Sequence, residues 1–291
     1  MGRRSCVRTW PAVTRPEPTL PVAVFDSGVG GLTVLHECLV SLPHEDFVYL
    51  GDTGRFPYGE RSPEQLRAFA LELSERLLGE GAKLLVVACN AASSAALPFL
   101  REELGERVGV VGVVAPESRL AAGATRSGRV GLLATPATVA SGAYARELER
   151  VAPGATLHAV ATSELAPLIQ EGGEVDERVV ACVEEACGPF REAGVDTVIL
   201  GCTHYPLVRP IIQRALGRGV EIVTSGQAIA EEVEHALAER GLERESSRRG
   251  RYRFLCSGDP ESFRSLGTRF LQLPLGDVGT VTVAAAASEA A

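Results

Sequence analysis

Residues 198–207 have the sequence VILGCTHYPL, in which an apolar run and a glycine are followed by Cys202, Thr203 and His204. The apolar run is typical of a buried strand, and Gly201 allows the backbone to turn where that strand ends. A thiol, a hydroxyl and an imidazole therefore arrive together at the carboxyl end of a predicted strand. Open parallel sheets bind their ligands at this end, so we expect a functional site here.

A second stretch of the same shape lies earlier in the chain. Residues 84–94, LLVVACNAASS, place Cys89 and Asn90 between an apolar run and the small residues that open a predicted helix. This cysteine and Cys202 are 113 residues apart. We therefore expect two related halves, each of which brings one thiol to the carboxyl end of a strand, and both thiols to face one substrate.

A further pair of strands supports an internal duplication. A predicted strand at 22–25 leads into Asp26, and one at 130–134 leads into Thr135, with a helix predicted after each. The offset between these two polar residues is 109, close to the 113 between the cysteines. Two matches in the same order at similar offsets indicate a repeated unit.

Predicted strands and helices alternate along the chain, which implies parallel sheets with helices on both faces. We predict an α/β protein with two pseudo-symmetric, doubly wound domains, each with a parallel central sheet, and an active site in the cleft between them. The first domain is expected to span 21–113 and 225–275, and the second 114–224. Residues 1–20 are predicted to be a disordered N-terminal extension and residues 276–291 a C-terminal tail.

The composition narrows the class of protein. The chain has 291 residues, of which 45% are hydrophobic and 23% charged, as in ordinary globular proteins. A net charge of −8 without a lysine or arginine block in the body of the chain argues against a nucleic-acid partner. No apolar run approaches the roughly 20 residues of a transmembrane helix, so we expect no membrane partner. Seven dispersed cysteines, an odd number, favour a reducing cytoplasm.

Metal and nucleotide cofactors find little support in the sequence. Cys182 and Cys187 are separated by four residues, but no second Cys/His pair stands beside them, so buried helix thiols are the better interpretation. The glycines at 28–31, GVGG, lack the G-x-G-x-x-G spacing of a dinucleotide loop. We expect no metal and no nicotinamide cofactor.

Two thiols on opposite sides of a substrate suit inversion at a carbon that bears an acidic hydrogen. One thiolate removes the proton, and the opposite thiol returns a proton to the other face. A free thiol is only about 3% ionised at pH 7, so each cysteine needs help from a helix amino terminus or a neighbour. Either cysteine alone could be a small buried hydrophobe, but polar residues follow both. We therefore predict that Cys89 and Cys202 are catalytic.

Neighbouring polar residues complete the predicted site. His204 is a candidate general acid or base beside Cys202. Asp26, with Ser27 beside it, could position Cys89 or contact a substrate ammonium, although both residues could simply cap a helix.

Two loop pairs are candidate donors to a substrate carboxylate. Tyr58 lies next to Gly59, and Thr135 lies three residues before Thr138. Turn and capping roles explain the two threonines equally well.

Five segments together resemble the glutamate racemase family, whose members interconvert L- and D-glutamate for peptidoglycan without a cofactor. They are VFDSGVGGLTVL, YLGDTGRFPYG, VVACNAAS, LGCTHYPL and SGDPESF, within a resemblance that spans roughly residues 21–275. The resemblance implies a bacterial cytoplasmic enzyme, often a homodimer, without pyridoxal phosphate or metal. It further implies that Cys89 and Cys202 are the bases and that substrate is contacted by Asp26, Ser27, Tyr58, Gly59, Asn90, Thr203 and His204.

The chain departs from the family pattern at several positions. Ala91 stands where the family usually has threonine or serine, so only its backbone N–H could contact substrate. Gln170, followed by Glu171, stands where a glutamate commonly supports the second cysteine. Thr224 replaces an aspartate and Gly54 an alanine. The first two departures bear on substrate affinity and on the balance between the two directions.

Three alternatives remain open on the sequence alone. The nearest is a racemase for aspartate or another amino acid. A cysteine hydrolase that uses Cys202 and His204 predicts that Cys89→Ser keeps its activity. A catalytically weakened descendant that binds an amino acid predicts ligand binding without turnover.

Overall fold

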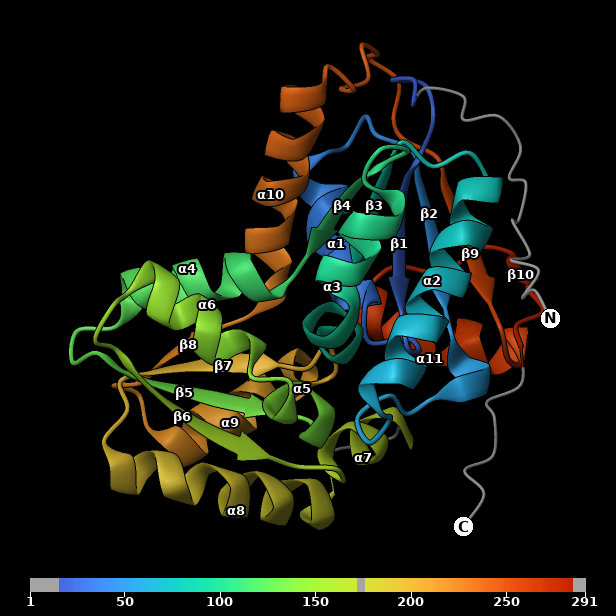
Figure 1. The fold of residues 1–291 in the computed structure, drawn as a ribbon. Helices are drawn as coiled ribbons and strands as arrows, with labels where there is room; N and C mark the ends of the chain where they lie inside the picture. Colours follow the sequence, from blue (N-terminus) through green and yellow to red (C-terminus); the bar gives the residue numbers. More distant parts are fainter. Residues whose placement is uncertain (1–15, 172–175, 285–291) are drawn as a thin grey trace, which may run out of the picture.

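The computed structural model describes residues 16–171 and 176–284. Over these residues ten strands form two separate sheets, and every hydrogen-bonded pair of strands is parallel (Figure 1). The predicted α/β class with two parallel sheets is therefore confirmed.

The larger sheet has the order β10-β9-β2-β1-β3-β4. Its strands are β1 (Val22–Asp26), β2 (Phe47–Gly51), β3 (Leu84–Val87), β4 (Gly109–Gly112), β9 (Tyr252–Cys256) and β10 (Val278–Thr280). The helical elements associated with it are α1 (Leu32–Ser41), the short η1 (Thr53–Arg55), α2 (Pro63–Gly79), α3 (Asn90–Leu104), α10 (Ser225–Arg240) and α11 (Pro260–Leu271).

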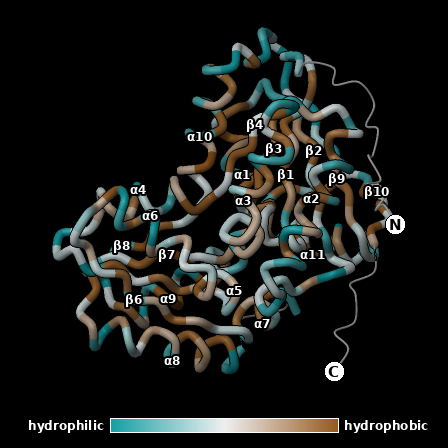
Figure 2. Tube along the Cα trace, in the orientation of Figure 1, coloured by the Kyte–Doolittle hydropathy of each residue, from teal (hydrophilic) through white to brown (hydrophobic). Residues whose placement is uncertain are grey.

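Helices cover both faces of this sheet and bury its central strands β1, β2 and β3 on both sides. Along β1, Val22 and Val24 pack in one core with residues of α1, α10 and α11, whereas Ala23 and Phe25 pack in the other with α2 and α3. Figure 2 shows hydrophobic residues concentrated along the strands and hydrophilic residues at the outer turns. This is the pattern expected for a parallel sheet between two helical layers.

The smaller sheet has the order β6-β5-β7-β8. Its strands are β5 (Arg129–Ala134), β6 (Thr156–Ala161), β7 (Thr197–Gly201) and β8 (Glu221–Val223). Its helical elements are α4 (Val114–Ala124), α5 (Pro136–Ala140), α6 (Ala143–Val151), α7 (Leu165–Glu171), α8 (Glu177–Ala193), η2 (Tyr205–Val208) and α9 (Arg209–Leu216).

The two sheets share one strand order. The run β4-β3-β1-β2 in the larger sheet corresponds to β8-β7-β5-β6 in the smaller one, so β1 matches β5 and β3 matches β7. Asp26 and Thr135 stand at the ends of the first matched pair, and Cys89 and Cys202 follow the ends of the second. The predicted pseudo-symmetry is confirmed, and it explains why two thiols reach equivalent positions.

The chain passes between the sheets twice, from β4 into α4 and from β8 into α10. Helix α4 packs against α6, β7 and β8 of the smaller sheet and also against α10. The two passages therefore lie side by side. The exact domain boundaries stay a prediction.

Both predicted chain ends need correction. Residues 278–280 form β10, which pairs in parallel with β9, so the predicted tail at 276–291 is wrong for this strand. It was missed because three residues with a central glycine give a weak strand pattern. The predicted disorder at 1–20 is also wrong near its end, since Pro18 accepts a hydrogen bond of 2.8 Å from Lys83 Nζ. Residues 1–15 and 285–291 lie outside the described part of the chain.

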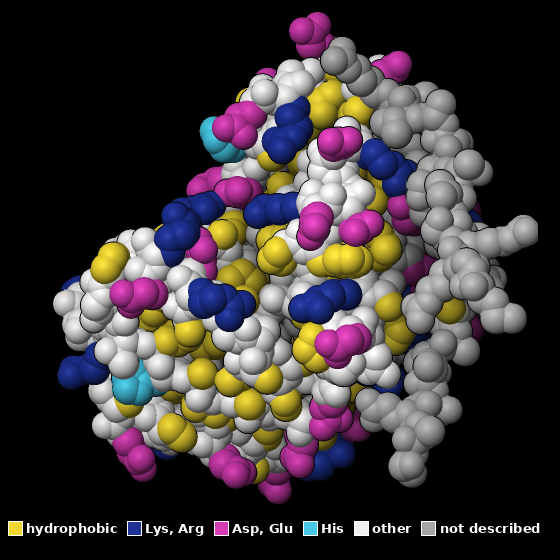
Figure 3. All heavy atoms as spheres, viewed as in Figure 1, with side chains coloured by type: hydrophobic (Ala, Val, Ile, Leu, Met, Phe, Trp, Pro, Cys, Tyr) yellow, Lys and Arg dark blue, Asp and Glu magenta, His cyan; other side chains and the backbone are white. Residues whose placement is uncertain are grey.

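The charged side chains on the surface and the length of the helices are the features relevant to nucleic-acid and membrane partners. Basic and acidic side chains are interspersed on the face seen in Figure 3, without a single large basic area. None of the helices in the described ranges has the length and apolar character to cross a membrane.

We expect Val281→Ala to lower the free energy of unfolding by about 2 kcal/mol, because Val281 is buried directly after β10 and would lose two methyl groups from a packed core. Chemical denaturation measures this loss. The adjacent, exposed Thr282→Ala serves as control and should change stability by less than about 0.5 kcal/mol. Equal stability of the two variants would show that the segment after β9 does not pack on the sheet.

Candidate active site

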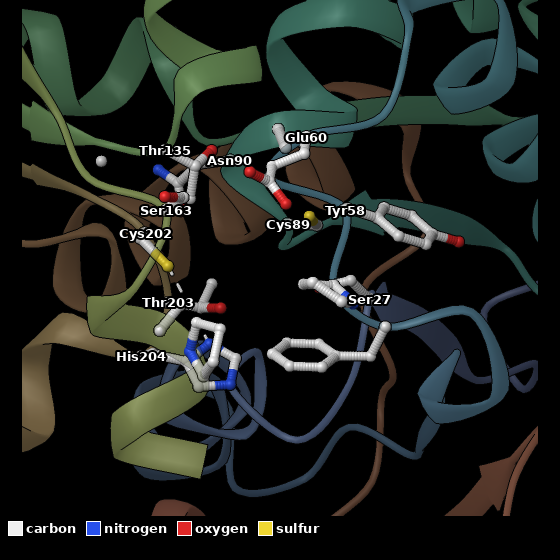
Figure 4. Close-up of a pocket in the computed structure, with 17 residues that line it drawn as sticks. Ser27, Tyr58, Glu60, Cys89, Asn90, Thr135, Ser163, Cys202, Thr203 and His204 are labelled. Carbon is white, nitrogen blue, oxygen red and sulfur yellow. Dashed lines mark hydrogen bonds between the residues drawn. The ribbon is translucent and has the colours of Figure 1, made fainter. Parts of the chain in front are cut away.

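A pocket lies where the carboxyl ends of the two sheets face each other (Figure 4). The space between its lining atoms, open solvent at its mouth included, is about 440 Å³. Ten of the predicted site residues line it, namely Ser27, Tyr58, Gly59, Cys89, Asn90, Ala91, Thr135, Cys202, Thr203 and His204. Asp26 and Thr138 are buried behind this lining rather than in it.

The two thiols enter the pocket from different sheets. Cys89 is the N-cap residue of α3, and Cys202 follows β7 directly. Figure 4 shows the two sulfur atoms on opposite sides of the pocket. Their residues are 5% and 8% exposed, so both thiols are largely withdrawn from water.

Burial favours the neutral form of both thiols. It raises the pKa of Cys89 to about 12; the Asp26 carboxylate adds to the rise, and N–H groups of Ala92 and Ser27 oppose it. Burial also raises the pKa of Cys202 far above its ordinary value, and the nearby Cys89 adds to that rise. Both residues are therefore thiols in the resting pocket.

His204 stands beside Cys202 as a neutral imidazole. Its Nδ1 lies 3.9 Å from Cys202 Sγ, and its Nε2 lies 2.9 Å from Gln170 Oε1. Burial lowers the pKa of His204 to about 3. The rings of Phe56 and Phe270 pack on the imidazole with centroid separations of 5.4 and 5.2 Å. The ring is thus held by packing and by one amide.

Asp26 joins the turns after β1 and β7. Its carboxylate accepts hydrogen bonds from Gly28 N–H at 3.1 Å and from Thr203 Oγ1 at 3.3 Å. Burial raises the pKa of Asp26, while these bonds oppose the rise. Thr33 Oγ1 in turn donates to the Thr203 carbonyl at 3.2 Å. The hydrogen bonds tie the loop that carries Cys202 to the opposite sheet.

Tyr58 lines the pocket with its ring but not with its hydroxyl. The hydroxyl donates to Asp52, which also accepts from Arg55 Nε at 2.6 Å and from Ser257 Oγ at 2.5 Å. Figure 4 shows the phenol oxygen pointing away from the two cysteines. Tyr58 therefore shapes the pocket, and its hydroxyl is committed elsewhere.

The predicted threonine pair and Gly59 meet at one side of the pocket. Thr135 Oγ1 lies 3.1 Å from Thr138 Oγ1, and the Gly59 carbonyl accepts a 2.8 Å bond from Ala137 N–H. A Cβ atom at Gly59 would come within 2.9 Å of Thr135 Cβ. The loop of one sheet and helix α5 of the other are thus in direct contact here.

Sequence reasoning missed seven residues that line the pocket, among them Glu60 and Ser163. Ser163 comes two residues after β6, at the carboxyl end of a parallel strand, so the rule that located the cysteines could also have located it. Glu60 directly follows the predicted Gly59. The remaining five are Phe56, Pro57, Ala166, Pro167 and Gly201.

The sequence predicts that Cys182 and Cys187 are helix thiols rather than metal ligands. Both lie on α8, away from the pocket lining. Over the described ranges, no three His, Cys, Asp or Glu side chains are grouped so that they could hold a metal ion. The groups that line the pocket and could take part in chemistry are thiols, hydroxyls, amides, the Glu60 carboxyl group and one neutral imidazole.

Comparisons with known proteins identify the class of protein that has this fold and a pair of facing thiols. The Asp/Glu/hydantoin racemase family matches residues 34–233, and the chain belongs to this family. Glutamate racemase from Geobacter metallireducens is 42% identical over 92% of this chain and 98% of its own length.

Two crystal structures of glutamate racemases share the fold. The enzyme from Thermus thermophilus, in complex with beta-chloro-D-alanine, has a TM-score of 0.81 at 42% identity and covers 92% of this chain and 98% of its own. The enzyme from Francisella tularensis, in complex with D-glutamate, has a TM-score of 0.85 at 30% identity, with coverages of 91% and 98%.

We expect Gly30→Ala to lower kcat/KM at least about 100-fold, because the added Cβ would lie 2.4 Å from Thr203 Oγ1 and 2.5 Å from His204 Nδ1 and would displace both side chains beside Cys202. The measurement is the steady-state rate of amino-acid racemisation. Gly123→Ala is the control, since nothing lies within 4 Å of a Cβ at this exposed position in α4. If Gly30→Ala kept full activity, the positions of the Thr203 and His204 side chains would not matter for the reaction.

Proposed function

We propose that the protein is a glutamate racemase that interconverts L- and D-glutamate by proton transfer between two cysteines, without a cofactor. The observation that carries the proposal is the pair of buried thiols, which come from equivalent strand ends and face each other across one pocket. One thiolate takes the α-proton from one face of the substrate, and the opposite thiol donates its proton to the other face. The two cysteines exchange roles in the reverse reaction.

Forming the first thiolate is costly, and the site has means to offset the cost. A pKa of about 12 for Cys89 corresponds to roughly 7 kcal/mol for ionisation at pH 7. The substrate ammonium adds a positive charge to the pocket, and the amino terminus of α3 directs N–H groups towards Cys89. The same high pKa makes the thiolate, once formed, a strong base towards the α-proton.

The hydrogen bond from His204 to Gln170 assigns the roles of the two ring nitrogens. Because the amide oxygen Oε1 only accepts, the proton lies on Nε2, and Nδ1 has a free lone pair that faces Cys202. His204 therefore presents an acceptor for the Cys202 proton, although its pKa of about 3 makes the imidazolium costly in the resting pocket. A neutral amide supports the resulting imidazolium less than a carboxylate would, which makes Cys202 the harder thiol to ionise.

The remaining predicted residues hold the substrate and the loops. Asp26 keeps Thr203 in place and raises the basicity of Cys89 through its like charge. Hydroxyls of Ser27, Thr135 and Thr203 and the backbone N–H of Ala91 are proposed to bind the carboxylates, on which negative charge develops in the transition state.

Glutamate is the proposed substrate because the compared racemases with 30% to 42% identity bear that name, and one was crystallised with D-glutamate. We further propose, on the family resemblance, a cytoplasmic homodimer whose D-glutamate supplies peptidoglycan. Racemisation of aspartate or another amino acid is the second candidate, because Ala91 removes a hydroxyl from the pocket wall.

Cys89→Ser and Cys202→Ser are each expected to lower the racemisation rate at least about 1,000-fold, because a hydroxyl is a far weaker acid than a thiol and inversion requires a donor on both faces. Circular dichroism follows the decay of L-glutamate and, separately, of D-glutamate to zero signal. Cys187→Ser, a buried thiol on α8, is the control and should keep its rate.

The same assay separates the alternatives. Racemisation retained in Cys89→Ser would contradict the two-thiol mechanism. A cysteine hydrolase that uses Cys202 and His204 would show no racemisation in the wild type or in the variants. No decay with glutamate but decay with another amino acid would change the substrate. Ligand binding without any decay would indicate a binding protein.

We expect Gln170→Glu to raise kcat/KM about tenfold near neutral pH, because a carboxylate at Nε2 favours the imidazolium form and so raises the pKa of His204. L- and D-glutamate have equal free energies, so kcat/KM must change by the same factor in both directions. Glu171→Gln, at the exposed neighbouring position, is the control. An unchanged rate would show that His204 does not assist Cys202.

A further inference from the structure

A fully buried glutamate, Glu117, lies where the two passages between the sheets meet. It belongs to the first turn of α4, and its exposed fraction is 0%. Its carboxylate accepts a hydrogen bond from the hydroxyl of Ser225, which opens α10 after the second passage. It also accepts from the hydroxyl of Tyr144 on α6 and from Nδ2 of Asn90, the first residue of α3, at 3.2 Å. One carboxylate thus joins four helices.

The donors to Glu117 determine how the Asn90 amide is oriented. An ionised carboxylate only accepts, so the amide must turn its NH₂ group towards it. The single hydroxyl proton of Tyr144 is also directed at the carboxylate, and its oxygen therefore accepts the second Nδ2 hydrogen at 2.8 Å. Both N–H groups of the Asn90 side-chain amide are therefore engaged by Glu117 and Tyr144.

The amide oxygen of Asn90 is left without a partner. Oδ1 is buried and makes no hydrogen bond to any described residue, in a side chain that is 2% exposed and lines the pocket next to Cys89. A buried acceptor without a donor is costly, and a ligand that supplies the donor removes that cost. The α-ammonium group of an amino acid is such a donor.

We propose that Glu117 is a positioning residue, which fixes the Asn90 amide so that Oδ1 accepts a hydrogen bond from the substrate ammonium. This inference rests on the proposed racemase function. If Glu117 loses its charge, its carboxyl can donate as well as accept, and the Asn90 amide is free to turn its NH₂ group into the pocket. An NH₂ group repels an ammonium, so substrate binding weakens while the thiols stay in place.

The surroundings of Glu117 make its charge sensitive to pH. Burial raises the pKa of Glu117 to about 7, while the bonds from Ser225, Tyr144 and Asn90 oppose the rise. Burial raises the pKa of Tyr144 well above 10, so this phenol stays neutral. The charged pair Arg119 and Glu232 joins α4 to α10 nearby, but both members are partly exposed.

The test compares wild type, Glu117→Gln and a control, Glu232→Gln, which makes the same chemical change at the same pair of helices. For both enantiomers, Glu117→Gln is expected to raise KM at least tenfold at pH 8 and to change kcat less than threefold. Wild-type KM should rise as the pH falls from 8 to 6, and Glu117→Gln should show no such rise. The control should match wild type.

Stability separates positioning from a structural role. Because burial raises the pKa of Glu117, the folded wild type loses stability relative to Glu117→Gln as the pH rises from about 4.5 to 7. Thermal unfolding should therefore show a variant that gains relative stability with pH while it binds substrate more weakly. A merely structural carboxylate would lower stability and leave the pH dependence of KM unchanged.

A double-mutant cycle with Asn90→Ala tests whether Glu117 acts through Asn90. In this background Glu117→Gln should have no further effect on KM, because the residue acts through Asn90. An unchanged KM in Glu117→Gln, or an equal increase in the Asn90→Ala background, would overturn the inference. The wild-type pH profile alone decides the matter if Glu117→Gln does not fold.

Calorimetric titration with L- and D-glutamate separates this inference from the proposed function. If wild type binds glutamate without turnover and Glu117→Gln binds it at least tenfold more weakly, the proposed function fails and the role of Glu117 stands. If wild type turns over and the variant matches it, only the inference fails. If wild type binds no glutamate, both fail.

Discussion

Holding two thiols away from water on facing sheet edges is the constraint on which the rest of the structure depends. Cys89 and Cys202 meet because β3 and β7 occupy the same place in two sheets of the same strand order, whose carboxyl ends face each other. Burial then keeps both thiols neutral and basic. The polar residues around them can be understood as the means of ionising one thiol at a time.

The contacts between the two sheets are polar where they matter for this chemistry. Asp26 and Thr203 link the turns beneath the thiols, and Glu117 links Asn90 to the two passages of the chain. Each link joins residues far apart in sequence through a buried carboxylate. A change in the relative position of the sheets would strain these bonds and move the groups that face the substrate.

Much of this arrangement could be predicted from sequence, and the remainder has a physical reason. Apolar runs just before Cys89 and Cys202 predicted each strand, the turn after it and its thiol together, and the parallel topology brings each thiol to the carboxyl edge of its own sheet. Ser163 escaped because it lies two residues beyond β6, where a serine is as typical of a turn or a helix cap as of a site. Glu117 escaped because its partners lie 27, 27 and 108 residues away, and no local pattern identifies a buried carboxylate on a helix.

The central claim is that each face of the substrate has its own proton carrier. The most direct measurement is racemisation of L-glutamate in D₂O, stopped before one tenth of the substrate is converted, with deuterium at the α-carbon of each enantiomer determined by mass spectrometry after chiral separation. The account predicts that the D-glutamate formed carries deuterium and that the remaining L-glutamate retains protium. D-glutamate that carries the original protium, or deuterium that enters L-glutamate as fast as inversion occurs, would contradict it.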